Sequence, residues 1–248
     1  MTAEGRVPTA EALKIKKKTI KYLIPMKNLM QLIKLDEAER RILLSLSVLS
    51  FFAVVMLMSR VFYTGNITYI FLAGNLILAW IPLALVRFLQ KQKLKGWQQM
   101  IIGLVWLLFL PNAPYLITDL IHLNHTYSLF YFDLMLIFCF AFTGLLLGTY
   151  ALLLMFAFLR ERIFYQTKPA YLLVGASIIL SSLGVFMGRE LRLNSWDALI
   201  NPLYTLITTF ENLTHTTVLL YLFYYTGIMG ASFVFFHLLN LPQHESNQ

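Results

Sequence analysis

The sequence is poor in charged residues and contains a single cysteine, and these two shortages exclude several classes of protein. Only 13% of the 248 residues are charged, whereas 58% are hydrophobic and the mean hydropathy is +0.68. A soluble domain needs more polar surface than this composition provides, so the composition favours an integral membrane protein. Because Cys139 is the only cysteine, an intrachain disulfide and a cysteine-cluster metal site are both excluded.

Familiar catalytic and targeting motifs are also missing. The sequence contains no glycine-rich phosphate loop, no nucleophile elbow and no paired-histidine zinc motif. Residues 1–41 contain no uninterrupted apolar core followed by a small-residue cleavage site, so we expect no cleaved signal peptide there. The sequence by itself therefore indicates no reaction, and we expect neither a metal nor a cofactor.

The positive charge that is present is distributed unevenly. The formal net charge is +8, and seventeen of the twenty Lys and Arg residues lie in three segments: 1–41, 87–95 and 160–168. The remaining three are Arg60, Arg189 and Arg192. Cytoplasmic loops of membrane proteins carry such an excess of basic residues. We therefore expect these three segments to be cytoplasmic, and the basic excess to report topology rather than binding of nucleic acid.

Long apolar runs predict an all-α, polytopic membrane helix bundle of about six spans, with both termini in the cytoplasm. The expected spans are about 42–63, 67–86, a broken third span from 97, and then 129–159, 170–188 and 215–239. The expected organisation is a basic cytoplasmic tail (1–41), a membrane domain (42–239) and a short cytoplasmic tail (240–248).

Small residues in the fourth and fifth spans predict close packing between helices. They recur at a spacing of four, which lets helix backbones approach one another. The pairs are Gly144 with Gly148, Ser177 with Ser181, and Gly184 with Gly188. Asn75, inside the second span, is interpreted as a residue that forms a hydrogen bond between helices.

The basic tail contains an amphipathic stretch at 13–35, where Met26, Leu29, Met30 and Ile33 share one helical face. Such a helix can lie on an anionic cytoplasmic leaflet, so the bilayer and its anionic lipid are the expected partners of this segment. The alternative is a solvated tail that only fixes the orientation of the protein. The oligomeric state is left open by the sequence.

The third span is interrupted by Pro111 and Pro114 on either side of Asn112. The fourteen residues 97–110 reach only ~21 Å as a helix, which is short of a ~30 Å hydrocarbon core. The sequence therefore predicts a break inside the membrane or close to its surface. Backbone at that depth must be satisfied by protein or by a water-filled cavity, which makes the break the best candidate for a site.

The helix expected after the break has one polar face. Tyr115, Thr118, Asp119 and His122 fall at i, i+3, i+4 and i+7. The start of this helix would offer unpaired backbone N–H groups to an anion. The alternative is a kinked helix whose polar stripe pairs with its neighbours and binds nothing.

A second polar segment, 188–197, follows the fifth span. Its arginines, Arg189 and Arg192, are suited to phosphate or carboxylate, and Trp196 is suited to the membrane interface. In the alternative interpretation, an arginine pairs with an acidic residue and only ties the outer ends of the helices together. The acidic residues available for this are Asp119, Asp133 and Asp197.

Together these segments resemble a known family. The resemblance is carried by Phe109-Leu-Pro-Asn-Ala-Pro-Tyr-Leu-Ile-Thr-Asp-Leu-Ile-His122, by Tyr131-Phe-Asp133, and by Gly188-Arg-x-x-Arg-x-Asn-Ser-Trp-Asp197. These motifs are similar to those of the bacterial membrane proteins grouped as domain-of-unknown-function family 1361, over about 43–239. The resemblance implies a multi-pass protein of the bacterial cytoplasmic membrane, and it implies no activity.

Both polar segments map to the extracytoplasmic half, which predicts a polar cavity that opens outward. The candidate site residues are Asn112, Tyr115, Asp119, His122, Asp133, Arg189, Arg192, Asn194, Trp196 and Asp197.

Three functions remain open at this point. The first is binding or transport of a polar or anionic solute or lipid headgroup, in which Asp119 and His122 would carry a coupled proton. The second is an intramembrane enzyme, a hydrolase or envelope-precursor transferase, in which the same two residues act as an acid/base pair or bind a metal. The third is a structural or assembly partner whose polar motifs only stabilise its fold.

Overall fold

A computed structural model of the chain describes residues 37–123, 129–193, 195, 197–213 and 216–239. The chain forms two compact units, Met1–Leu44 and Ser45–Gln248, which are described separately. In the first unit the described residues form the first turns of helix α3, where Arg41 donates a hydrogen bond of 2.7 Å to Glu37. The amphipathic stretch at 13–35 and the C-terminal tail lie outside the described residues.

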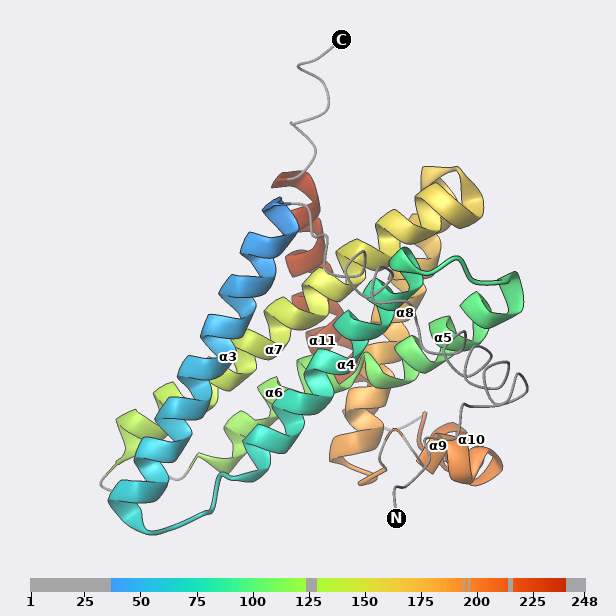
Figure 1. Cartoon of the computed structure of the whole chain (residues 1–248). Helices are drawn as coiled ribbons and strands as arrows, with labels where there is room; N and C mark the ends of the chain where they lie inside the picture. Colours follow the sequence, from blue (N-terminus) through green and yellow to red (C-terminus); the bar gives the residue numbers. More distant parts are fainter. Residues whose placement is uncertain (1–36, 124–128, 194, 196, 214–215, 240–248) are drawn as a thin grey trace, which may run out of the picture. The chain divides into compact units, whose positions relative to one another are not determined.

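Six helical segments among the described residues are long and apolar enough to cross a membrane (Figure 1). They are α3 (Glu37–Thr64), α4 (Phe71–Lys91), α5 (Gly96–Phe109) continued by α6 (Asn112–Thr118) and η1 (Asp119–His122), α7 (Phe130–Phe158) continued by η2 (Leu159–Phe164), α8 (Thr167–Arg189), and α11 (Thr216–Leu239). The described residues contain no strand. The protein is therefore an all-helical, multi-pass membrane protein, and the predicted number of spans is confirmed.

Helix α7 forms the core of the second unit. It is apolar on all sides, which is the pattern of a helix surrounded by others, and α4, α6 and α11 pack against it. In the most hydrophobic part of its span 61% of the residues are buried, against 39% for α4 and 17% for α11. Phe140 and Leu147 are fully buried at its centre. The other helices leave much of their apolar surface exposed.

Two glycines of α7 allow α6 to pack tightly against it. A Cβ at Gly144 would lie 2.5 Å from the carbonyl oxygen of Ala113, and one at Gly148 would lie 2.9 Å from the Ala113 Cβ. Such contacts are too short for any side chain, so only glycine permits this approach. The prediction that this pair lets helices pack closely is confirmed.

Two glycines of α8 likewise allow α8 to pack closely against Pro111 and Tyr115. A Cβ at Gly184 would overlap the ring of Pro111, and one at Gly188 would lie 3.1 Å from the ring of Tyr115. The Ser177 hydroxyl, by contrast, donates to a carbonyl of its own helix. Four glycines, two from α7 and two from α8, thus leave the space in which the chain around the two prolines packs between these helices.

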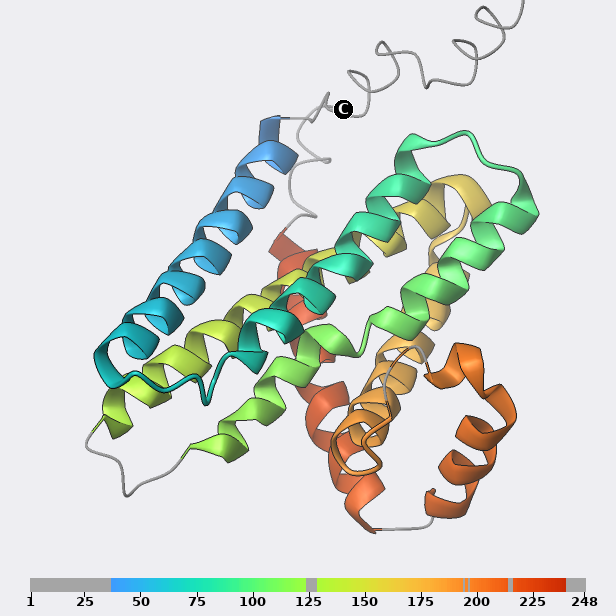
Figure 2. The same ribbon diagram turned by 60° about the horizontal axis from the view of Figure 1, so that its bottom comes forward.

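Helix α5 ends at Phe109 and α6 begins at Asn112, with Leu110 and Pro111 between them (Figure 2). Both intervening residues keep right-handed helical dihedrals, with φ/ψ of −54°/−39° and −58°/−26°. The N–H of Ala113 donates to the Leu110 oxygen at 3.2 Å, and the N–H of Tyr115 donates to the Pro111 oxygen at 3.0 Å. The interruption is therefore a tight turn, and these two amide groups are already engaged rather than offered to an anion.

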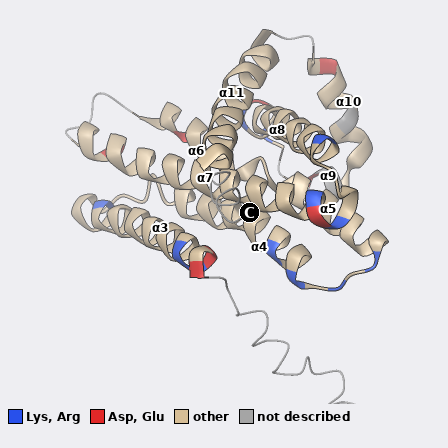
Figure 3. Cartoon of the chain, turned by 90° about the horizontal axis from the view of Figure 1, so that it is seen from above, with Lys and Arg blue, Asp and Glu red and all other residues tan. Residues whose placement is uncertain are grey.

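Basic residues of the second unit gather at one end of its helices. Lys93 lies in the connection between α4 and α5, and Arg160 and Arg162 lie in η2; Figure 1 shows these segments toward the same end, and Figure 3, seen from above, marks Lys and Arg in blue. Arg189 is at the opposite end of α8. The break at Pro111 and the end of α8 are thus remote from these basic loops.

Candidate functional site

The site is built where η1 meets the end of α8. Nη2 of Arg189 donates to Oδ1 of Asp119 at 3.0 Å, and Nδ2 of Asn75 on α4 donates to Oδ2 at 3.0 Å. Asp119 is 1% exposed, and Nη1 of Arg189 lies 3.2 Å from Nε2 of His122. A buried carboxylate is costly unless it is paired in this way. The pairing of Arg189 with Asp119 is one of those that the alternative interpretation of the second polar segment left open, and the predicted interhelical hydrogen bond of Asn75 is confirmed.

The arginine is also held by an aromatic ring. Its guanidinium carbon lies 5.1 Å from the centre of the Tyr115 ring, within the range of a cation–π contact. Beneath the same ring, Gly188 leaves room for the close approach. Three of the four residues of the predicted polar stripe, Tyr115, Asp119 and His122, thus contact Arg189, whereas the Thr118 hydroxyl donates to the Tyr115 carbonyl oxygen. Within the described residues, Nε of Arg189 is buried and makes no hydrogen bond.

Asp133 forms a separate ion pair. Nε and Nη2 of Arg60 on α3 donate to its two carboxylate oxygens at 2.6 and 3.0 Å, and the two side chains are 5% and 1% exposed. The Arg60 guanidinium also lies 4.4 Å from the centre of the Tyr69 ring. This fork geometry is the strongest form of an arginine–carboxylate contact. Asp133 was expected among the groups around Arg189, and its pairing with Arg60 places it outside that cluster.

The segment after α8 does not continue as a helix. Arg192 is exposed and has a left-handed φ of 54°, which turns the chain away from the α8 axis. Asp197 begins a short helix, α9 (Asp197–Ile200). Asn194 and Trp196 lie outside the described residues, so their predicted roles stay predictions.

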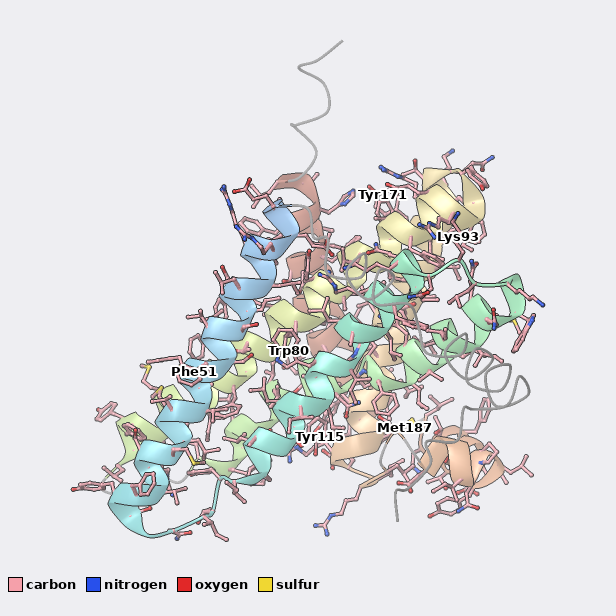
Figure 4. The ribbon with its side chains drawn as sticks, in the orientation of Figure 1. Phe51, Trp80, Lys93, Tyr115, Tyr171 and Met187 are labelled. Carbon is pink, nitrogen blue, oxygen red and sulfur yellow. The ribbon has the colours of Figure 1, made fainter. Side chains whose placement is uncertain are left out.

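A cavity of about 390 Å³ lies beside the break, between α4, α5, α8 and α10 (Pro202–Asn212). Much of its wall is made by leucines of α5 and α8, which are Leu104, Leu107, Leu108, Leu180 and Leu183. Its polar lining consists of amides and hydroxyls, from Asn75, Asn112, Tyr115, Ser195, Thr205 and Thr209. Figure 4 shows Tyr115 and Met187, which both line the cavity, in the half of the unit away from Lys93.

Asn112 and Ser195 join the two predicted polar segments at the cavity wall. Nδ2 of Asn112 donates to Oγ of Ser195 at 3.0 Å and to the Phe109 oxygen at 2.9 Å. This pair brings the two polar segments together at the cavity wall, whereas the prediction that the charged candidate residues surround a polar cavity open to the outside stays a prediction. Asp119 and Arg189 do not line the cavity themselves. They contact Asn75 and Tyr115, which do line it.

Sequence reasoning missed several residues of the site. Thr205 and Thr209 of α10 line the cavity, and no motif in the sequence marks them. Arg60 was recognisable as a cation inside an apolar span, where a charge requires a partner. Among the described residues, no three His, Cys, Asp or Glu side chains lie close enough together to hold a metal ion.

The chemistry available at the cavity surface is that of neutral hydrogen bonding and apolar contact. Amide and hydroxyl groups both donate and accept hydrogen bonds, whereas the leucine wall offers only apolar surface. Asp119 and His122 do not line the cavity. Any action of these two residues on a bound molecule is therefore indirect, through Asn75, Tyr115 or Arg189.

Comparison with known families matches residues 75–230 to the family described as "Protein of unknown function (DUF1361)". This is more than half of the chain, and it includes both polar segments and every residue that lines the cavity. No curated protein and no solved structure matches the chain. The resemblance seen in the sequence motifs is confirmed.

Proposed function

The chain belongs to the DUF1361 family of proteins of unknown function, and we propose that it binds or transports a polar lipid through the cavity beside Pro111. The observation that carries this proposal is the mixed lining of the cavity, which combines leucines with amides and hydroxyls. Leucines of α5 and α8 form one part, whereas Asn112 and Ser195 with neighbouring hydroxyls form another. An amphipathic molecule matches such a lining, because its chain and its polar group each find the surface that suits them.

In this proposal the cavity is entered from the lipid-facing side of the bundle. Leu104 and Leu180 line the cavity and are also 60% and 49% exposed on the surface of α5 and α8. An opening flanked by exposed leucines in a membrane protein faces acyl chains rather than water. A lipid would enter sideways between α5 and α8 and bring its polar end toward Asn112.

The size of the cavity supports part of a lipid as the ligand. Ligand cavities in proteins commonly measure roughly 300–1,000 Å³. At about 390 Å³, this cavity accommodates a headgroup or the upper part of one chain. The remainder of the molecule would stay between the exposed leucines and the bilayer.

The ion pair behind the cavity has a positioning role in this proposal. Arg189 and Asp119 neutralise each other, and they fix the Tyr115 ring and the Asn75 amide that line the cavity. The cavity thus presents oriented neutral groups rather than a net charge. This arrangement supports binding better than acid/base catalysis, since Asp119 and His122 do not line the cavity.

The proposed location is the bacterial cytoplasmic membrane, with the cavity in the outer half. The basic loop between α4 and α5 and the basic η2 would be cytoplasmic by the positive-inside rule. The end of α8 and the break at Pro111 would then face the opposite side.

Photo-crosslinking tests the proposal. The full chain is placed in nanodiscs that contain phosphatidylglycerol with a photoactivatable diazirine in one acyl chain, and the adducts are mapped by mass spectrometry. We expect adducts concentrated on the cavity leucines Leu104, Leu107 and Leu183. Leu183→Trp fills the cavity and should abolish adducts on Leu107, whereas Leu104, which is also exposed to acyl chains outside the cavity, should keep its adducts. Leu172→Trp, on the same helix as Leu183 but 75% exposed and outside the cavity, should leave the adducts on Leu107 unchanged.

Two outcomes contradict the proposal. One is a set of adducts spread evenly over the exposed faces of α3 and α11 with none on α5 beside the cavity. The other is a Leu107 signal that Leu183→Trp and Leu172→Trp lower equally. Thermal unfolding of each variant shows that a lost adduct does not result from a lost fold.

A further inference from the structure

Helix α10 presents an apolar face that no other described element covers. Leu203, Ile207 and Phe210 lie at i, i+4 and i+7 on one side of this eleven-residue helix and are 74%, 55% and 68% exposed. On the other side, Thr205 and Thr209 line the cavity, and Thr205 is only 6% exposed. The helix is thus amphipathic in an unusual sense, with threonines toward the protein and large apolar side chains away from it.

The helix is too short to cross a bilayer and is tied to one that does. Eleven residues span ~17 Å as a helix, well short of a ~30 Å hydrocarbon core. Only residues 213–215 separate α10 from the first residue of α11, Thr216. Four Cα–Cα steps of 3.8 Å give a reach of at most ~15 Å. Helix α10 must therefore stay close to the level at which α11 enters the membrane.

The preceding span ends at the same level. Ser182 of α8 and Thr226 of α11 share a hydrogen bond of 2.9 Å, and the Tyr221 hydroxyl donates to Glu190 at 2.7 Å, just beyond the end of α8. The end of α8 is therefore beside the start of α11. Figure 2 shows α9 and α10 at this end of the unit. The short link to α11, and the hydrogen bond of 3.4 Å from Thr209 to the sulfur of Met187 near the end of α8, thus hold α10 at this end.

The charge and side-chain pattern of α10 fits a membrane boundary. Its one ionisable carboxylate, Glu211, and the aromatic Tyr204 lie at the edge of the apolar face, and both are exposed. Tyrosine is enriched at the headgroup level, where its ring and hydroxyl meet apolar and polar surroundings. A helix with large apolar residues on one face and a polar edge lies in the plane of the interface with that face among the acyl chains.

We infer that α10 is an interfacial helix whose Leu203, Ile207 and Phe210 side chains bind the boundary between lipid headgroups and acyl chains. The inference does not depend on the cavity being occupied. It has a structural consequence for the cavity, because Thr205 and Thr209 form part of the cavity wall. Lipid contact on one face of α10 therefore helps to hold that wall in place on the other.

Site-directed spin labelling tests this inference in the full chain. Cys139, the only native cysteine, is replaced by alanine, and single nitroxide labels are introduced through Ile207→Cys, Phe210→Cys and Glu211→Cys. The variants are reconstituted in vesicles of phosphatidylcholine and phosphatidylglycerol. Collision rates with oxygen, which concentrates in lipid, and with a water-soluble nickel chelate are then measured. We expect the labels at 207 and 210 to collide several-fold more with oxygen and less with nickel than the label at 211.

Equal nickel accessibility at all three positions would overturn the inference, because the face would then be in water. Protection of 207 and 210 from both reagents would also overturn it, because the face would then be covered by protein, such as a second copy of the chain. If a label at 210 prevents folding, Leu203→Cys provides the same measurement on the same face.

Discussion

Asn112 donates a hydrogen bond of 3.0 Å to Ser195, a residue 83 positions later in the chain, and both line the same cavity. One residue sits between the two prolines of the third span, and the other lies in the connection after α8. Their contact joins the two polar segments at the polar part of an otherwise leucine-rich cavity. The stability of this junction and the shape of the cavity should therefore depend on each other.

Removing the amide of Asn112 should weaken the junction more than removing the hydroxyl of Ser195. Asn112→Ala eliminates two hydrogen bonds, one to Ser195 and one to the Phe109 carbonyl, whereas Ser195→Ala eliminates one. Each net hydrogen bond contributes about 0.5–1.5 kcal/mol, so we expect losses of about 1–3 and about 1 kcal/mol in the free energy of unfolding. Thermal unfolding in detergent measures both. Equal stability of Asn112→Ala and the unaltered chain would show that the contact is absent in the protein.

Removing one partner of the ion pair between Arg60 and Asp133 should lower the free energy of unfolding strongly, whereas replacing both partners by apolar residues should lower it little. Asp133→Leu alone leaves a buried guanidinium without its carboxylate, and breaking a buried pair in this way costs about 3–5 kcal/mol. The double variant Arg60→Met with Asp133→Leu removes both charges and should recover most of that loss. The measurement is the unfolding midpoint of both single variants and the double variant. Additive losses in the double variant would contradict the pairing.

Gly184 and Gly175 offer a matched comparison on one helix. Alanine at Gly184 would overlap the Pro111 ring, whereas a Cβ at Gly175 meets nothing within 4 Å. Overpacking of this kind costs about 1–3 kcal/mol, and Gly→Ala in an open helical position is favourable by up to about 1 kcal/mol. We expect Gly184→Ala to lower the unfolding midpoint and Gly175→Ala to leave it unchanged or raise it. The same response from both would mean that α8 does not pack against Pro111.

The ring of Tyr115, rather than its hydroxyl, should matter for Arg189. The guanidinium lies over the ring at 5.1 Å, so Tyr115→Phe keeps the contact and Tyr115→Leu removes it. A cation–π contact in a desolvated setting contributes about 2 kcal/mol. We expect Tyr115→Phe to unfold near the midpoint of the unaltered chain and Tyr115→Leu to unfold earlier, as measured by thermal unfolding. A larger loss for Tyr115→Phe than for Tyr115→Leu would assign the role to the hydroxyl instead.

Much of the fold follows from local patterns in the sequence. Long apolar runs are sufficient to identify the six spans, because a helix that crosses lipid must be apolar over about twenty residues. Small residues at a spacing of four located the contact faces of α7 and α8 at Gly144 and Gly184, because only a missing side chain lets backbones approach. Helical spacing likewise placed Tyr115, Asp119 and His122 on one face.

The pairing of distant residues could not be obtained in the same way. Asp133 had several cationic candidates, and no local rule distinguishes Arg60, 73 positions away, from Arg189. The turn after α8 was not predicted either. Its left-handed φ is at Arg192, whereas glycine is the residue that usually indicates such a turn in a sequence. Helix α10 was not predicted, although Leu203, Ile207 and Phe210 carry the spacing of an amphipathic helix.

The measurement that tests the account most directly is an experimental structure of the full chain in lipid nanodiscs, with a rigid antibody fragment bound to aid alignment. The account predicts elongated non-protein density in the cavity between α5, α8 and α10, with one end beside Asn112 and Ser195 and the other between Leu104 and Leu180. A cavity closed by the side chains of these leucines, or Asn112 and Ser195 lying apart on separate faces of the bundle, would contradict it.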